Sequence, residues 1–134
     1  RSTPIPVSRK AAAEPPSKLG VRAGSTITVE NAIKALVTRS ANDVATAVGE
    51  FLGGSETNFA RMMTAKARQL GMNATTFQNA HGLPNNRQVT TARDMAILGP
   101  ELIPGPVRRG SWGHRQVRCP ETSRDANGST GVAE

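Results

Sequence analysis

Ser40 and Asn42 are the residues of this chain whose types and spacing could do chemistry together. They lie one residue apart in the run TRSANDVATAVGEFLGG, where one helical pattern ends and another begins. At such a break both side chains can point into one cleft, where a hydroxyl can both donate and accept a hydrogen bond and a carboxamide can do so without charge. Serine and asparagine are also frequent helix caps, so the pair could instead only cap the helix that follows.

Apolar residues at helical spacing predict a helix on each side of this pair. The first helix begins after Thr28, and its apolar face is formed by Val29, Ile33, Leu36 and Val37. The second begins near Asn42, and its buried face is formed by Val44, Ala47, Val48 and Phe51. Ser55 and Thr91 are candidate N-caps for two further helices, and residues 79–86 are dense in turn formers and predict a loop.

These patterns divide the chain into three parts and predict a mainly α fold. Residues 1–28 form an irregular or extended lead-in, because its prolines forbid a continuous helix. Residues 29–102 form a helical lobe that carries the Ser40–Asn42 pair. Residues 103–134 show neither the helical nor the strand periodicity of apolar residues. They contain no lysine and are rich in Gly, Arg and Pro. This tail is either disordered or the out-of-frame translation of a GC-rich gene.

The formal net charge of +7 first suggests a nucleic acid or an anionic membrane as partner. The basic excess lies mostly on the two poorly patterned ends, and residues 44–51 carry no Lys or Arg. A small helical nucleic-acid binder would need clustered basic residues on its recognition helix, so nucleic acid is not expected as a partner.

The sequence predicts no metal, cofactor or membrane span. Cys119 is the single cysteine, and the two histidines lie far apart, so no metal-ligand spacing is present. No stretch approaches the roughly 18 apolar residues of a transmembrane helix, and no signal-peptide core is found. The first residue is Arg1 rather than Met, which fits a fragment whose targeting signal lay upstream.

Three runs, found in order, carry a resemblance to a known family: IPVSRKAAAEPPSKLGVRAGSTITVENAIKALVTRSAND, GGSETNFARMMTAKARQLGMNATTFQNAHGLP and QVTTARDMAIL. From about residue 5 to residue 102 the chain resembles the D-alanyl-D-alanine carboxypeptidases, the low-molecular-weight penicillin-binding proteins. The resemblance implies the helical lobe of the β-lactamase/transpeptidase-like fold, without most of the antiparallel sheet lobe. Apolar helix faces that this sheet would cover should then be exposed, which favours marginal stability and aggregation.

The resemblance implies a two-step acyl transfer. In the family, a serine in an S-x-x-K motif attacks the bond between two terminal D-alanines of a peptidoglycan stem peptide, and the lysine serves as its base. Ser40 would form a hydrogen bond with this lysine and pass a proton toward the leaving D-alanine. Asn42 would orient the lysine and a substrate carbonyl. The resemblance also implies an intact parent protein, of which this chain is a fragment. β-Lactams would inhibit this parent, which would work in the periplasm, associated with the inner membrane.

His81, Gly82 and Leu83 match a family loop that runs along the floor of the active-site cleft and would contact substrate. His81 could be an acid–base residue, but the matching feature is the Gly-Leu turn rather than the histidine. A structural role for this loop is therefore favoured.

The chain departs from the family at two motifs. It contains neither an S-x-x-K nor a K-T-G sequence, and Ser8 and Ser17 lack a lysine three residues later. The expectation is an enzyme fragment that is inactive by itself. A non-catalytic module that binds the cell wall would also lack these motifs and stays open as an alternative.

Overall fold

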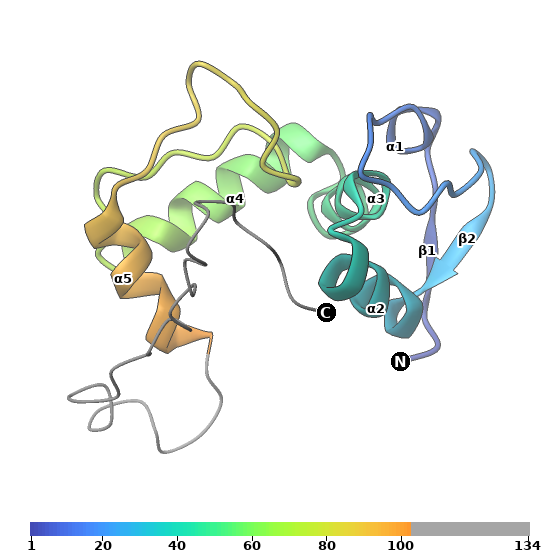
Figure 1. Cartoon of the computed structure of the whole chain (residues 1–134), viewed down its shortest axis with the longest axis horizontal. Helices are drawn as coiled ribbons and strands as arrows, with labels where there is room; N and C mark the ends of the chain where they lie inside the picture. The colour runs from blue at the N-terminus through green and yellow to red at the C-terminus, as the bar shows by residue number, and fades with distance from the viewer. Residues whose placement is uncertain (103–134) are drawn as a thin grey trace, which may run out of the picture. The chain divides into compact units, whose positions relative to one another are not determined.

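The computed structural model describes residues 1–102 (Figure 1). The unpatterned segment expected for 103–134 lies outside the described residues. Within residues 1–102, no helix combines the length and apolar character that crossing a lipid bilayer requires.

The described part of the chain is mainly α-helical, as the sequence predicts. Its helices are α1 (Arg9–Ala12), α2 (Val29–Arg39), α3 (Asn42–Gly53), α4 (Glu56–Gln69) and α5 (Ala92–Glu101). The strands β1 (Pro4–Pro6) and β2 (Thr26–Thr28) form a two-stranded antiparallel sheet in which Ile5 pairs with Ile27.

Three of the helices begin where the sequence places their caps. The Thr28 hydroxyl accepts a hydrogen bond from the backbone of Asn31, Ser55 caps α4 in the same way, and Thr91 caps α5. Each bond satisfies an amide that the first turn of a helix leaves without an intrahelical partner.

Residues 1–28, expected to be irregular or extended, contain both strands and also a single helical turn that the sequence analysis did not predict. Ser8 caps this turn, α1, by accepting from the backbone of Ala11. The turn ends before Pro15 and Pro16, which cannot continue a helix.

Helix α3 lies at the centre of the packing, since it contacts α1, α2, α4 and β1. Figure 1 shows α3 between the strands on one side and α4 on the other. Small residues let these elements approach closely; a Cβ at Gly53 would lie 2.7 Å from the backbone nitrogen of Phe59. The buried core around α3 comprises Ile5, Val7, Ala11, Ile27, Ala32, Ala35, Ala41, Val44 and Ala47.

The predicted apolar faces of α2 and α3 are partly wrong. Ile33 and Val37 are 56% and 80% exposed, and Phe51 is 44% exposed, whereas Ala32 and Ala35 face the core. The helices pack through their alanines, which allow the closer contact, and this turns the larger apolar residues outward. The expectation of exposed apolar helix faces is confirmed at these positions.

A second apolar surface lies where α4 and α5 face each other. A cavity of about 390 Å³ opens there, lined by Phe59, Met62, Met63, Lys66, Ala67, Leu70, Met72, Phe77 and Leu98. Met62 is 47% exposed at this surface, whereas Met63 is half-buried.

The carboxylate of Asp43 fastens the lead-in to the first turn of α3. It accepts hydrogen bonds from the backbone N–H groups of Leu19, Gly20 and Val21 at 2.8–3.1 Å, and from that of Val44 at 2.9 Å. Burial raises the pKa of the Asp43 carboxyl, but these four donors outweigh it and hold the pKa below its ordinary value.

We predict that Asp43→Asn lowers the free energy of unfolding by about 2 kcal/mol or more, because an amide N–H group then faces backbone donors. The folded-state pKa is depressed, so the stabilisation by Asp43 is complete above the unfolded pKa and is lost as the pH falls. Urea unfolding monitored by circular dichroism should therefore show a difference between wild type and variant that shrinks toward acid pH. A difference that stays constant from pH 7 to acid pH would contradict this origin.

Candidate functional site

Ser40 forms the C-cap of α2 in a left-handed conformation, with φ +50° and ψ +46°. Among the described residues it is the only non-glycine residue with positive φ. This conformation costs an L-residue about 1–2 kcal/mol, and such strain concentrates at functional sites. The reversal at Ser40 separates α2 from α3 by two residues and leaves the Ser40 side chain exposed.

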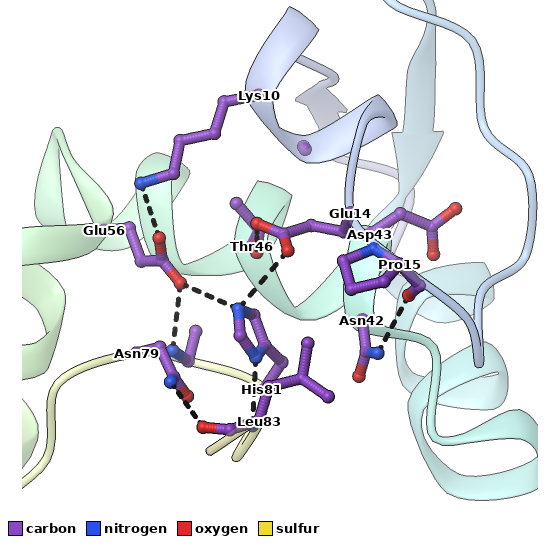
Figure 2. A network of polar contacts seen from close by, with 12 residues as sticks. Lys10, Glu14, Pro15, Asn42, Asp43, Thr46, Glu56, Asn79, His81 and Leu83 are labelled. Carbon is purple, nitrogen blue, oxygen red and sulfur yellow. Dashed lines mark hydrogen bonds and ion pairs between the residues drawn. The ribbon is translucent and has the colours of Figure 1, made fainter. Parts of the chain in front are cut away.

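Asn42 is the first residue of α3 and is buried. Its backbone N–H donates to the Ser17 carbonyl at 2.8 Å, and its side-chain Nδ2 donates to the Pro15 carbonyl at 2.9 Å. The carboxamide is therefore held in a fixed orientation by the lead-in (Figure 2).

The helix-capping alternative for Ser40 and Asn42 is wrong. The N-cap of α3 is Ala41, which makes no side-chain capping bond, and Ser40 ends α2 rather than starting α3. No hydrogen bond in the described part of the chain joins the two side chains, and Ser40 is exposed whereas Asn42 is buried. That they face one groove stays a prediction.

The loop with His81, Gly82 and Leu83 is a tight polar turn. The Asn79 side chain accepts from the Gly82 N–H at 2.7 Å and donates to the Leu83 carbonyl at 2.9 Å. Gly82 has φ +82°, a conformation that favours glycine. Gln88 accepts from the backbone N–H groups of residues 78 and 79, so the loop is braced from both of its ends.

The start of α5 is attached to the segment before this loop through Asp94. Its carboxylate accepts from the Thr75 hydroxyl at 2.6 Å and from the Ala74 N–H at 3.0 Å. The Thr75 hydroxyl is the main cause of the lowered pKa of Asp94. Asp94 therefore fixes the first turn of α5 to residues 74 and 75.

His81 does not lie alone but belongs to a cluster with Glu14 and Glu56, which we call the Glu14–Glu56–His81 cluster. The His81 Nε2 lies 3.5 Å from Glu14 Oε2 and 3.4 Å from Glu56 Oε1 (Figure 2). Lys10 Nζ pairs with the other oxygen of Glu56 at 2.6 Å. The cluster thus joins the lead-in, the first residue of α4 and the loop.

The surroundings of Glu56 lower the pKa of its carboxyl group. Burial raises the pKa of the Glu56 carboxyl, but Lys10, the Ala80 N–H and His81 together hold it below its ordinary value. The ion pair with Glu56 in turn raises the pKa of Lys10. Glu56 also lies at the N-terminus of α4, where the helix dipole favours a negative charge.

The sequence analysis missed Lys10, Glu14 and Glu56 as parts of this site. The three residues are distant in sequence from His81 and from the Ser40–Asn42 pair, so no local motif marks them. In the sequence, Glu56 is recognisable only as an acidic residue directly after the Ser55 cap. That position predicts stabilisation of the helix start rather than a polar cluster.

The helical lobe, with Ser40 and Asn42 at the strained junction of α2 and α3, agrees with the lobe that the sequence resemblance implies. The family model for D-alanyl-D-alanine carboxypeptidase matches residues 1–111. The chain belongs to this family of penicillin-binding serine peptidases, as the sequence resemblance indicated.

Individual relatives agree with this assignment. The chain is 35% identical to the D-alanyl-D-alanine carboxypeptidase DacF of Bacillus subtilis over 102 residues, which are 76% of this chain and 26% of DacF. It is 38% identical to DacC of Escherichia coli over 87 residues, 65% of this chain and 22% of DacC. It therefore spans about a quarter of the length of these curated relatives.

Solved structures confirm the fold. The D-alanyl-D-alanine carboxypeptidase DacD from Francisella tularensis superposes with a TM-score of 0.69 at 41% identity, covering 72% of this chain and 24% of that one. Penicillin binding protein 5 from Haemophilus influenzae superposes with a TM-score of 0.68 at 28% identity, covering 73% of this chain and 29% of that one. Residues 1–102 are the helical lobe of this fold without most of its sheet.

We predict that Glu56→Gln lowers the free energy of unfolding by about 1–3 kcal/mol at pH 7, because Lys10 loses its charged partner. Since the folded-state pKa of Glu56 is depressed, this contribution is complete above the unfolded pKa and disappears as the pH falls. The exposed pair Glu30–Lys34 provides the control, because Glu30→Gln should change stability by less than about 1 kcal/mol. Equal losses from both substitutions in chemical denaturation would contradict the prediction.

Proposed function

We propose that this chain forms part of a serine-type D-Ala-D-Ala carboxypeptidase that removes the terminal D-alanine from peptidoglycan stem peptides through an acyl-enzyme. The family match over residues 1–111 supports this function. The observation that carries it at the site is the run Ser40-Ala41-Asn42-Asp43 at the strained junction of α2 and α3. The intact parent would act in the periplasm, associated with the inner membrane, and would be inhibited by β-lactams.

In this proposal Ser40 and Asn42 serve a nucleophile that residues 1–134 do not supply. The exposed Ser40 hydroxyl would bond the lysine of an S-x-x-K motif and relay a proton to the departing D-alanine nitrogen. The Asn42 carboxamide would orient that lysine and a substrate carbonyl. Because its Nδ2 already donates to the Pro15 carbonyl, its oxygen has a set direction, which suits an orienting role.

The loop with His81, Gly82 and Leu83 would line the floor of the substrate cleft. Its hydrogen bonds to Asn79 and Gln88, and the contacts of His81 with two carboxylates, support a loop that keeps one shape while substrate binds. This makes a structural contribution to substrate binding the favoured role of His81, with acid–base catalysis as the second possibility.

We predict that the purified chain forms no covalent adduct with a fluorescent penicillin, because it contains neither an S-x-x-K nor a K-T-G sequence. The measurement is in-gel fluorescence after incubation, with an intact carboxypeptidase of the family as the positive control. A labelled band at the mass of the chain would show that it contains its own nucleophile.

The roles of Ser40 and Asn42 can be tested in a chimera in which residues 1–102 replace the matching segment of DacC. The chimera should react with fluorescent penicillin, and Ser40→Ala or Asn42→Ala should slow the acylation by about 100-fold or more. Ser25→Ala, in an exposed turn, is the matched control and should leave the rate unchanged. An active chimera whose rate is unaffected by Ser40→Ala and Asn42→Ala would refute these roles.

A further inference from the structure

The Glu14–Glu56–His81 cluster holds its three donor atoms in positions that suit a cation. We propose that it binds a divalent transition-metal ion of the Zn²⁺ type through His81 Nε2, Glu14 Oε2 and Glu56 Oε1. Such a site is separate in chemistry from the Ser40–Asn42 pair and does not depend on acyl transfer. It would add a metal site where the spacing of histidine and cysteine in the sequence predicts none.

The spacing of the donor atoms supports a bound metal ion. His81 Nε2 lies 3.5 Å from the Glu14 oxygen and 3.4 Å from the Glu56 oxygen. Both separations exceed the length of a normal N–H···O hydrogen bond, which is about 2.7–3.2 Å. A tetrahedral ion with bonds of about 2.0–2.2 Å places its ligand atoms about 3.3–3.6 Å apart. The three atoms all lie within 4.8 Å of one another.

The carboxylate oxygens that face away from His81 are already held by other partners. Glu14 Oε1 accepts from the Thr46 hydroxyl at 3.1 Å, and Glu56 Oε2 pairs with Lys10 at 2.6 Å. In Figure 2 the other oxygen of each carboxylate points toward the His81 ring, and that of Glu56 also accepts from the Ala80 N–H at 3.2 Å. Partners of this kind orient metal ligands and set their basicity.

Burial and charge also support a bound metal ion. The side chains of His81, Glu56 and Glu14 are only 8%, 7% and 12% exposed, and His81 points its Nε2 between the two carboxylates. Of the lysines and arginines in the described part of the chain, only Lys10 forms an ion pair with these carboxylates. Two carboxylates against one lysine leave a negative charge in a poorly hydrated site, which a bound cation would compensate.

Binding would change the tautomer of His81. The Leu83 N–H donates to His81 Nδ1 at 3.2 Å, so the neutral ring carries its proton on Nε2. When the ion binds Nε2, that proton leaves and solvent returns one to Nδ1, so the ring stays neutral and no net proton is released. Nδ1–H then faces the Leu83 N–H, and the backbone at Leu83 must turn away. Metal binding would therefore alter the turn formed by residues 81–83.

The test uses the full chain without a histidine tag and Zn²⁺ as the probe. Isothermal titration calorimetry should show one saturable site, and NMR should show shifts of the His81 ring and Leu83 amide signals. Glu14→Gln and His81→Gln should each weaken binding about tenfold or more. Glu30→Gln, an exposed substitution of the same kind, should bind like the wild type.

Two further controls keep the result unambiguous. His114 and Cys119 could bind Zn²⁺ by themselves, so the double variant H114Q/C119S should retain full affinity. Circular dichroism checks the fold of each variant, and where a variant does not fold the His81 and Leu83 shifts of the wild type decide the outcome. Absence of saturable binding, or binding that H114Q/C119S abolishes and Glu14→Gln leaves intact, would overturn the proposal.

Discussion

Asp43 makes the interaction on which the rest of the described structure depends. Its buried carboxylate collects backbone N–H groups from Leu19, Gly20 and Val21, a segment with no helix or strand of its own, and fixes that segment against the first turn of α3. A buried carboxylate is costly unless charge-assisted hydrogen bonds compensate it, and here backbone donors do so. Because Asn42 is the preceding residue, the same attachment places its carboxamide against the Pro15 carbonyl. The geometry of the Ser40–Asn42 pair is thus set from the lead-in as much as from the two helices.

The second polar centre is the Glu14–Glu56–His81 cluster, and its hydrogen-bonding partners differ from those of Asp43. Asp43 is satisfied by fixed backbone donors, whereas the Glu14–Glu56–His81 cluster consists of side chains whose charges can change. It connects the lead-in, α4 and the loop at residues 79–83. The loop takes its shape from Asn79 and Gln88, and its position from Glu56, which accepts the Ala80 N–H at 3.2 Å. A polar connection of this kind specifies one arrangement of the loop, which an apolar contact alone would not.

The apolar surface of the chain is unusually open for so small a unit. Large side chains on α2, α3 and α4 are exposed, and the cavity between α4 and α5 is lined almost entirely by apolar residues. The chain spans about a quarter of the length of its curated relatives, and residues 1–102 contain only a two-stranded sheet. Exposed apolar area of this extent reduces the hydrophobic stabilisation that residues 1–102 can supply by themselves.

By itself the sequence determined what depends on neighbours within three or four residues. The caps at Thr28, Ser55 and Thr91, the helices that follow them and the turn-rich loop were all predicted, because a capping bond joins a side chain to an amide three residues later. Tertiary structure decided which helix faces are buried and which charges meet. Ile33, Val37 and Phe51 fit a helical apolar stripe, yet they are exposed because α2 and α3 pack through smaller residues. The Glu14–Glu56–His81 cluster joins three segments distant in the chain, and periodicity and spacing carry no information about such contacts.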